Sequence, residues 1–552
     1  MKIGLIAESF GMDSLKHVFR GLEQTLAQRH EVVYCPLEYY YTSALKQGSL
    51  CEDFLKSCDI VVGRIDEEIL KSRERLDRQP PLVGFLMGTM SRGGAELAAL
   101  TGHLKSTDML VGNCTGDLEI TRKFFSNAET RKLPFAVDES LFYPADEDER
   151  RKIKTELGFG EDDKIVLYAG RITIEKNLHT LLRIFRTLQD LVPNLHLVIA
   201  GEVQDIPFGG MGVYSISMTA TLMKLIKELE LNSSSIHFVG RKSAAQLRDI
   251  YASADVFVNM TLHHDENFGL SQVEAMACGT PVVGTSWGGL KDTILHGETG
   301  YQVSTVVTGS GIKVNWWEAI NRIVSLLEDE EMLQRFRERS RVHAVETYSM
   351  QCYSENLESI LIECSRNGGH KREPLNITAF ADEFWLKCMP RATAPPPFQR
   401  GEESFELYKE LIFPFTGATE VMVPAGAELG TEQLLMIAVP AEIQGSKIKI
   451  DDPIFPLEVN VPETTRTTCE AILEVMRREP VISFESLEKR IPETERDCLR
   501  TTLEWMFLMG LLLRANPIEG SVEPGDIGPL MSKPLFSIRS VDFTNTDVIA
   551  IK

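Results

Sequence analysis

The chain has 552 residues, of which 43% are hydrophobic and 25% are charged, a composition typical of folded globular domains. Its formal net charge of −22 at pH 7 argues against nucleic acid and anionic membranes as partners, because both attract basic surfaces. Its ten cysteines are scattered without a C-x2-C pair, and no apolar stretch reaches about 18 residues, so we expect a cytoplasmic protein with reduced thiols and no metal site.

Apolar strands that alternate with amphipathic helices predict a Rossmann-like domain over residues 1–145. Its first strand is expected at residues 3–7, followed by a loop that contains Gly11 and by a helix over residues 15–28. Later strands are expected at residues 59–62 and 82–86.

A second Rossmann-like domain is predicted over residues 146–345. Its apolar run at residues 255–260 is typical of a buried parallel strand. A helix follows the next loop, and we expect Gly279, Thr280 and Pro281 to end it before another short strand.

The loop and helix after this strand carry two carboxylates, Glu266 and Glu274, eight residues apart. Ligands of open α/β sheets bind at the carboxyl ends of the strands, where this loop lies. The backbone N–H groups of residues 268–270 suit a phosphate oxygen, because they open a helix. The carboxylates repel phosphate and are better suited to accept hydrogen bonds from hydroxyls. A diphosphate flanked by two polyols describes a nucleotide sugar.

This pattern resembles the E-x7-E signature of the family 4-like group of retaining glycosyltransferases. Residues 168–177 resemble the family's G-R-x(4)-K-N element. Three further family segments follow in the expected order, at residues 197–201, 237–241 and 297–301. The resemblance extends over roughly residues 1–365 and implies the α/β fold called GT-B, in which two Rossmann-like domains face a cleft. The first domain would face the acceptor, the second would bind the donor, and residues 346–368 would form a crossover helix.

The resemblance assigns catalytic roles to Arg171 and Lys176, which would stabilise the leaving diphosphate, and to Glu266, which would bind hydroxyls of the donor sugar. Glu274 would bind the ribose. The other donor-binding residues that it implies are Gly11, Gly170, Gly240, Arg241, Asn267, Phe268, Gly269 and Leu270. No metal is implied, because the basic pair replaces a cation. Relatives usually retain configuration without a stable enzyme nucleophile; a double displacement through Glu266 is the alternative.

The function that these expectations describe is retaining transfer of a sugar from a nucleotide sugar, a UDP- or GDP-sugar, to a soluble acceptor such as a small molecule, saccharide or peptide. No further cofactor is expected. Two alternatives stay open: a non-catalytic GT-B scaffold or interaction protein, and a GT-B disaccharide synthase or phosphorylase. The chain departs from the family in two respects: residues 85–90 lack the histidine that many relatives carry after a strand of the first domain, and residues 202–217 are longer than the usual connection. His103 is the nearest candidate, and no role is carried over to it.

Residues 369–400 are rich in glycine and proline and predict a linker. The extension that follows, residues 401–552, lies outside the resemblance, and an α+β fold with a winged-helix-like module is expected there. Helical apolar spacing occurs at residues 467–478, 484–491 and 493–515. No basic stripe emerges, so the extension is predicted to bind a protein partner or to mediate self-association. Truncation near Asn367 is then expected to spare donor binding.

Overall fold

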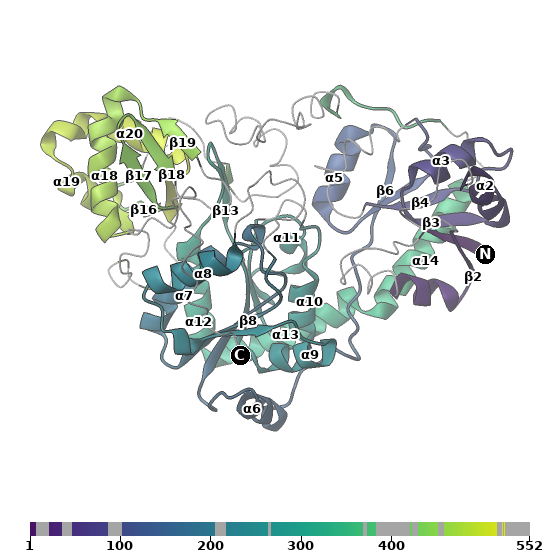
Figure 1. The fold of residues 1–552 in the computed structure, drawn as a ribbon, viewed down its shortest axis with the longest axis horizontal. Helices are drawn as coiled ribbons and strands as arrows, with labels where there is room; N and C mark the ends of the chain where they lie inside the picture. The colour runs from purple at the N-terminus through teal and green to yellow at the C-terminus, as the bar shows by residue number, and fades with distance from the viewer. Residues whose placement is uncertain are drawn as a thin grey trace.

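The structure is a computed structural model of the chain (Figure 1). It describes residues 1–6, 21–35, 47–86, 102–204, 217–262, 266–367, 373–381, 420–421, 429–450, 457–515, 522 and 524. Among these residues, no helix is both long enough and apolar enough to cross a membrane.

The N-terminal domain is built on a parallel six-stranded sheet with the strand order β2-β1-β3-β4-β5-β6. The strands are β1 (Lys2–Ile6), β2 (Glu31–Tyr34), β3 (Ile60–Arg64), β4 (Leu82–Phe85), β5 (Met109–Gly112) and β6 (Glu129–Lys132). The helices are α2 (Gln47–Ser57), α3 (Glu67–Glu74) and α5 (Thr115–Phe124), and residues 21–27 are also helical. The central strands are buried along their length, because helices cover both faces of a parallel sheet.

The second domain repeats this architecture with the strand order β12-β11-β10-β7-β8-β9, again all parallel. The strands are β7 (Lys164–Ala169), β8 (Leu195–Ala200), β9 (Ile236–Gly240), β10 (Val256–Asn259), β11 (Val282–Thr285) and β12 (Gly300–Val303). The helices are α6 (Glu147–Glu156), α7 (Leu178–Leu191), α8 (Met218–Glu228), α9 (Ala244–Ser253), α10 (Leu270–Ala277), α11 (Leu290–Thr293), α12 (Trp316–Glu328) and α13 (Glu330–Tyr348). The expectation of two Rossmann-like domains is confirmed.

The strand order of the second sheet reverses between β7 and β10. From β7 the chain proceeds outward to β8 and β9, and from β10 it proceeds in the opposite direction to β11 and β12. The loops that follow β7 and β10 therefore diverge from adjacent strands. Such a switch point is the place where open α/β sheets bind their ligands.

The chain returns to the N-terminal domain through α14 (Met350–Asn367), which lies beside the strands of that domain in Figure 1. Apolar side chains of α14, among them Leu357 and Leu361, share a buried cluster with Ile3 and Val83 of the first sheet. Residues 373–381 also lie against this domain, with Leu375 buried. This part of the segment that composition predicts as a linker is therefore packed.

The C-terminal extension contains helices and two small antiparallel sheets, in the orders β20-β16-β21 and β17-β18-β19. The strands are β16 (Leu434–Ile437), β17 (Ala441–Gln444), β18 (Lys447–Ile450), β19 (Leu457–Asn460), β20 (Val481–Ser483) and β21 (Leu512–Ala515). The helices are α18 (Arg466–Arg478), α19 (Phe484–Arg490) and α20 (Leu499–Leu508), which follows a 3₁₀ turn, η6 (Glu493–Cys498).

The prediction of helical structure over residues 493–515 is wrong at its end. The helix α20 stops at Leu508, and β21 pairs with β16. Gly510 lies in the left-handed region, with φ of 68°, which ends the helix and turns the chain into the sheet. The apolar run after it suits a buried strand as well as a helix.

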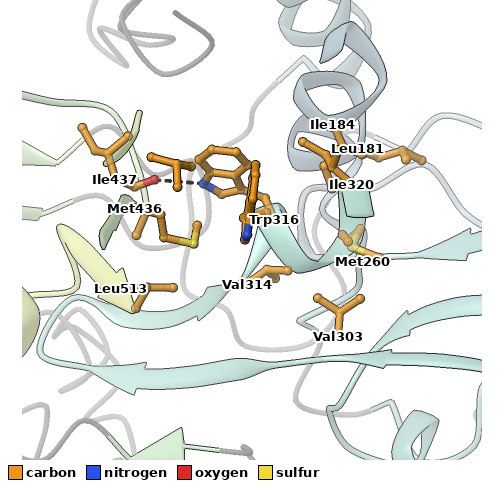
Figure 2. Close-up of a cluster of buried hydrophobic side chains, with 14 of the residues drawn as sticks. Leu181, Ile184, Met260, Val303, Val314, Trp316, Ile320, Met436, Ile437 and Leu513 are labelled. Carbon is orange, nitrogen blue, oxygen red and sulfur yellow. Dashed lines mark hydrogen bonds between the residues drawn. The ribbon is translucent and has the colours of Figure 1, made fainter. Parts of the chain in front are cut away.

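The extension packs directly onto the second domain. One continuous apolar cluster contains Ile320 and Val314 of the second domain together with Met436 and Leu513 of the extension. Trp316 lies at the junction, and its indole Nε1 donates a hydrogen bond of 2.9 Å to the carbonyl of Ile437 (Figure 2). The expectation that the linker leaves the extension separable from the donor-side domain therefore fails, because truncation would strip one side of a shared core.

A hairpin of the second domain provides the rest of this junction. Strands β13 (Thr305–Thr308) and β14 (Gly311–Val314) form the hairpin, and β15 (Glu420–Val421) adds to its edge in parallel. At its tip, the Gly309 N–H donates to the carbonyl of Leu508 over 2.7 Å, and Ser310 Oγ donates to that of Met509 over 2.6 Å. The hairpin thus caps orphan carbonyls at the end of α20.

Gly510 offers a test of this docking, because a Cβ atom there would lie 2.2 Å from Thr308 Oγ1 of the hairpin. Gly510→Ala should lower the free energy of unfolding through two effects. The left-handed backbone costs about 1 kcal/mol, and the clash costs a further 1–3 kcal/mol or so.

Gly445→Ala is the matched control. Gly445 has a similar φ of 64°, but a Cβ atom there would meet nothing within 4 Å. The control should show only the backbone cost in urea or thermal unfolding. Equal losses in the two variants would contradict the docking.

Candidate functional site

The loop after β7 carries the first basic residues of the candidate site. It begins at Gly170 and passes through a 3₁₀ turn, η1 (Ile174–Lys176), into α7. Asn177 joins the turn to the helix with φ of 59°, a left-handed conformation that asparagine adopts more readily than most residues. Its Nδ2 donates to the carbonyl of Met260 over 2.9 Å, so the start of α7 is fixed to the end of β10.

The loop after β10 carries Glu266 and enters α10 at Gly269. Gly269 has φ of 81°, and a Cβ atom there would lie 2.3 Å from Leu290 Cδ2. The turn at Gly288 and Gly289 packs against the backbone of this loop, and the Gly289 N–H donates to the carbonyl of Glu266 over 2.6 Å. Only glycine fits beneath the loop, since a Cβ atom on Gly289 would lie 2.1 Å from the Asn267 carbonyl carbon.

The two loops meet at the switch point of the sheet. Lys176 Nζ forms an ion pair with Glu266 Oε2, and the two side chains are only 16% and 14% exposed. The backbones are tied as well, because the Leu262 N–H and Thr261 Oγ1 both donate to the carbonyl of Glu175 over 3.2 Å. The structure therefore brings together a cation and a carboxylate that lie 90 residues apart in sequence.

Arg171 lies in the same loop as Lys176. Its Nη1 is 3.9 Å from Oε1 of Glu175, whose side chain is fully buried, while Arg171 is partly exposed. The hydroxyl of Tyr168 donates to the carbonyl of Arg171 over 2.7 Å. Burial, and then the negative charge of Glu266, raise the pKa of Tyr168, so its hydroxyl remains a donor. The backbone of this loop at Arg171 is thus fixed by the Tyr168 hydroxyl.

The first turn of α10 is open to a ligand on chemical grounds, because its N-cap is Gly269 and no side chain caps it. Its backbone N–H groups and the helix dipole favour an anion. The Phe268 ring is buried, with ring centroids 5.5 Å from Phe135 and 5.4 Å from Tyr348. Phe268 therefore has only its backbone to offer a ligand.

Glu274 lies on the second turn of α10, where its carboxylate accepts a hydrogen bond of 2.9 Å from the Tyr251 hydroxyl of α9. Removal of water by burial raises the pKa of Glu274 to about 7, although the Tyr251 hydrogen bond acts in the opposite direction. Glu274 and Glu266 are therefore carboxylates in different environments, one beside a neutral hydroxyl and one beside an ammonium.

The remaining predicted residues are placed as follows. Gly240 ends β9 with φ of 68° and open space around its Cα, and Arg241 beside it is exposed. Gly11 and the segment 87–101 lie outside the described residues, so the site of the missing family histidine does too. His103 lies on the N-terminal domain with Nδ1 2.7 Å from Glu74 Oε2, which gives it a surface ion-pair role when protonated.

One contact joins the two domains near the site. Asp292 of α11 accepts hydrogen bonds from the Thr115 N–H and Oγ1, at 2.6 and 2.7 Å, and from Lys132 Nζ at 2.6 Å. Burial alone would raise the pKa of Asp292, but the bonds from Lys132 and Thr115 hold it below its usual value. Helix α5 has no side-chain cap of its own, and Asp292 of the opposite domain thus caps its first turn.

Sequence reasoning missed Tyr251, the glycine pair 288–289 and Asp292. Tyr251 is a single tyrosine in an ordinary amphipathic helix, and nothing in its sequence context marks its partner. The glycine pair is the one visible signal, because two adjacent glycines after a strand indicate a close backbone approach. Across the described part of the chain, no group of three or more His, Cys, Asp or Glu side chains is placed to hold a metal ion.

Two parallel sheets, with charged side chains at the switch point of the second, define a two-domain α/β protein with a candidate ligand site on its second domain. Residues 149–343 match the family model described as glycosyl transferases group 1.

The chain is similar to two curated relatives over part of its length. It is 25% identical over 231 residues to N-acetyl-alpha-D-glucosaminyl L-malate synthase of Bacillus anthracis, which covers 42% of this chain and 53% of the relative. It is 30% identical over 197 residues to mannosylfructose-phosphate synthase of Agrobacterium fabrum, covering 35% of this chain and 41% of that enzyme. The chain thus spans about half the length of these relatives.

The fold is similar to that of a glycosyltransferase from Rickettsia africae. The TM-score is 0.53 at 14% sequence identity, and the match covers 66% of this chain and 99% of that structure. The GT-B architecture is therefore confirmed for the two Rossmann-like domains.

The pKa of Glu274 predicts a pH-dependent stability. Since the folded-state pKa is raised above the ordinary value of 4.5, the neutral form stabilises the fold below pH 4.5, and this contribution is lost as the pH rises through about 7. Glu274→Gln removes the cost of ionisation and keeps an oxygen for Tyr251. The variant should therefore be more stable than the wild type at pH 8, by about 1–3 kcal/mol, and similar to it only at pH 4, below the unfolded-state pKa.

Thermal unfolding of the ligand-free protein at the two pH values checks this expectation. Glu156→Gln on the exposed face of α6 serves as the control and should change neither midpoint. A Glu274→Gln variant that is less stable at pH 8 than the wild type would contradict the assigned environment.

Proposed function

We propose that the protein is a retaining glycosyltransferase that moves a sugar from a nucleotide sugar to a soluble acceptor. The observation that carries the proposal is the Lys176–Glu266 pair at the switch point, beside the uncapped first turn of α10. An ammonium and free N–H groups suit a diphosphate, and a carboxylate suits sugar hydroxyls.

The ion pair leaves both side chains able to form further hydrogen bonds. An ammonium has three N–H donors, and Glu266 uses one of those of Lys176, so others remain for a phosphate oxygen. The carboxylate likewise keeps acceptor positions for hydroxyls of the donor sugar. The pair would therefore fix the reacting sugar and its leaving group relative to each other.

Transfer develops negative charge on the departing diphosphate and positive character on the sugar. Arg171, Lys176 and the N–H groups of residues 268–270 would stabilise the diphosphate without a metal ion, as preorganised donors do at other oxyanions. The departing phosphate would take the acceptor proton on the same face, which retains the configuration. Double displacement is disfavoured because Glu266 is already held by Lys176.

The donor is proposed to be a UDP- or GDP-sugar, with Glu274 on the ribose. Both curated relatives described above are named as synthases of small glycosides, which supports a small soluble acceptor. A disaccharide-phosphate synthase is the second candidate, favoured by the similarity to mannosylfructose-phosphate synthase. A cytoplasmic location and a protein partner for the extension stay predictions from the sequence.

Arg171→Ala and Lys176→Ala should each slow turnover of a nucleotide sugar by about 2–4 kcal/mol of transition-state stabilisation, because each removes charge from the leaving group. Release of nucleoside diphosphate measures the rate. Lys152→Ala, an exposed lysine on α6, is the control and should turn over like the wild type. Normal rates in both site variants, with folds intact by circular dichroism, would refute the assignment.

The two carboxylates should differ in what they bind. Glu274→Gln should weaken binding of UDP or GDP alone, whereas Glu266→Gln should spare the nucleotide and weaken its hexose conjugate. Isothermal titration calorimetry with each nucleotide and its conjugate separates the two effects. Equal losses for both ligands in both variants would show that the roles are misassigned.

A further inference from the structure

The hydroxyl of Tyr251 is a buried donor aimed at the donor-site carboxylate Glu274. Tyr251 is 1% exposed, and its hydroxyl lies 2.9 Å from Glu274 Oε2. It belongs to α9, whereas Glu274 belongs to α10, so the bond joins two neighbouring helices. The sequence resemblance assigns no role to this tyrosine.

The ring of Tyr251 is held on several sides, so its hydroxyl has little freedom to move. Its centroid lies 6.0 Å from that of Phe142 and 5.9 Å from that of Phe257. Its backbone carbonyl accepts a 2.6 Å hydrogen bond from Thr280 Oγ1, just beyond the end of α10. A donor fixed in this way presets the rotamer of the carboxylate that it touches.

We propose that Tyr251 is a positioning residue that holds the Glu274 carboxylate ionised and oriented, so that it accepts hydrogen bonds from both hydroxyls of a ribose. The proposal rests on the proposed function, because it takes Glu274 as the ribose ligand. It adds that the preference for a ribonucleotide over a 2′-deoxyribonucleotide is set by a residue that does not itself touch the nucleotide.

The electrostatics around Glu274 agree with this role. Burial raises its pKa to about 7, and the Tyr251 hydrogen bond is the one interaction that lowers it. Burial also raises the pKa of Tyr251, so the hydroxyl stays a donor throughout the neutral range.

The other groups around the pair come from four elements. Cys278 follows α10 and Tyr168 lies on β7; burial raises the pKa of both, so both are neutral near pH 7. Two cations lie on the Cys278 side, Arg248 of α9, which is paired with Glu149 and Asp249, and Arg341 of α13, which donates to the carbonyl of Ala277.

The test measures the ratio of the dissociation constants of 2′-deoxy-UDP and UDP, and of 2′-deoxy-GDP and GDP, from pH 5.5 to 9. The ratio isolates the ribose contact, because the phosphates of each pair titrate alike. In the wild type, the ratio should fall towards one as the pH drops through the titration of Glu274. In Tyr251→Phe, the midpoint of this fall should move upward by about one pH unit, since a hydrogen bond to the ionised form is lost.

Tyr353→Phe on α14 is the matched control, a buried tyrosine far from Glu274 in the N-terminal domain, and it should keep the wild-type profile. An unchanged midpoint in Tyr251→Phe would overturn the role of Tyr251. If that variant does not fold, a wild-type ratio that stays near one across the pH range overturns it equally well.

Glu274→Gln distinguishes this failure from failure of the proposed function. If Glu274→Gln abolishes the ribose preference while Tyr251→Phe keeps the wild-type midpoint, only the role of Tyr251 falls. If Glu274→Gln keeps the full preference, or none of the four nucleotides binds, the donor site itself is misassigned and both proposals fall.

Discussion

The ion pair between Lys176 and Glu266 is the interaction on which the site depends. It joins the loops after β7 and β10, which leave adjacent strands and then run in opposite directions along the sheet. It fixes the two side chains at the point where the loops diverge. The hydrogen bond from Asn177 to the carbonyl of Met260 and those to the carbonyl of Glu175 place the pair on a rigid base, so little of its geometry is left to the ligand.

The loop after β10 and the helix that follows it carry two carboxylates in different environments. Glu266 lies beside the Lys176 ammonium and the uncapped first turn of α10. Glu274 lies two turns further on, where burial disfavours ionisation and one hydroxyl resists that effect. A nucleotide sugar has hydroxyls on both sides of its diphosphate. Two acids at this spacing, which lie in different environments, are therefore suited to accept hydrogen bonds from hydroxyls at both ends of such a ligand.

The sequence predicts the elements whose cause is local. The buried run at residues 255–260 contains β10, and Gly279 ends α10 because its φ of 76° suits glycine. The contacts between elements are not visible in the same way. Tyr251 reaches Glu274 across 23 residues, and its effect depends on how α9 packs against α10. The strand β21 was predicted as helix because its apolar residues fit either state until the partner strand β16 is known.

The docking of the extension is another contact between elements that the sequence does not reveal. Apolar residues around Trp316 would fit a core of their own domain equally well, so composition does not reveal that the cluster also contains residues from beyond residue 430. In the structure, α12 contacts the extension through Trp316 and packs on α7 through Ile320, close to Leu181 and Ile184 (Figure 2). The helix α7 begins next to Lys176. Helix α12 therefore lies between the extension and the helix that begins next to the candidate site, in one shared core. Close-packed interiors of this kind transmit displacements. The extension is thus a structural part of the domain that carries the candidate site.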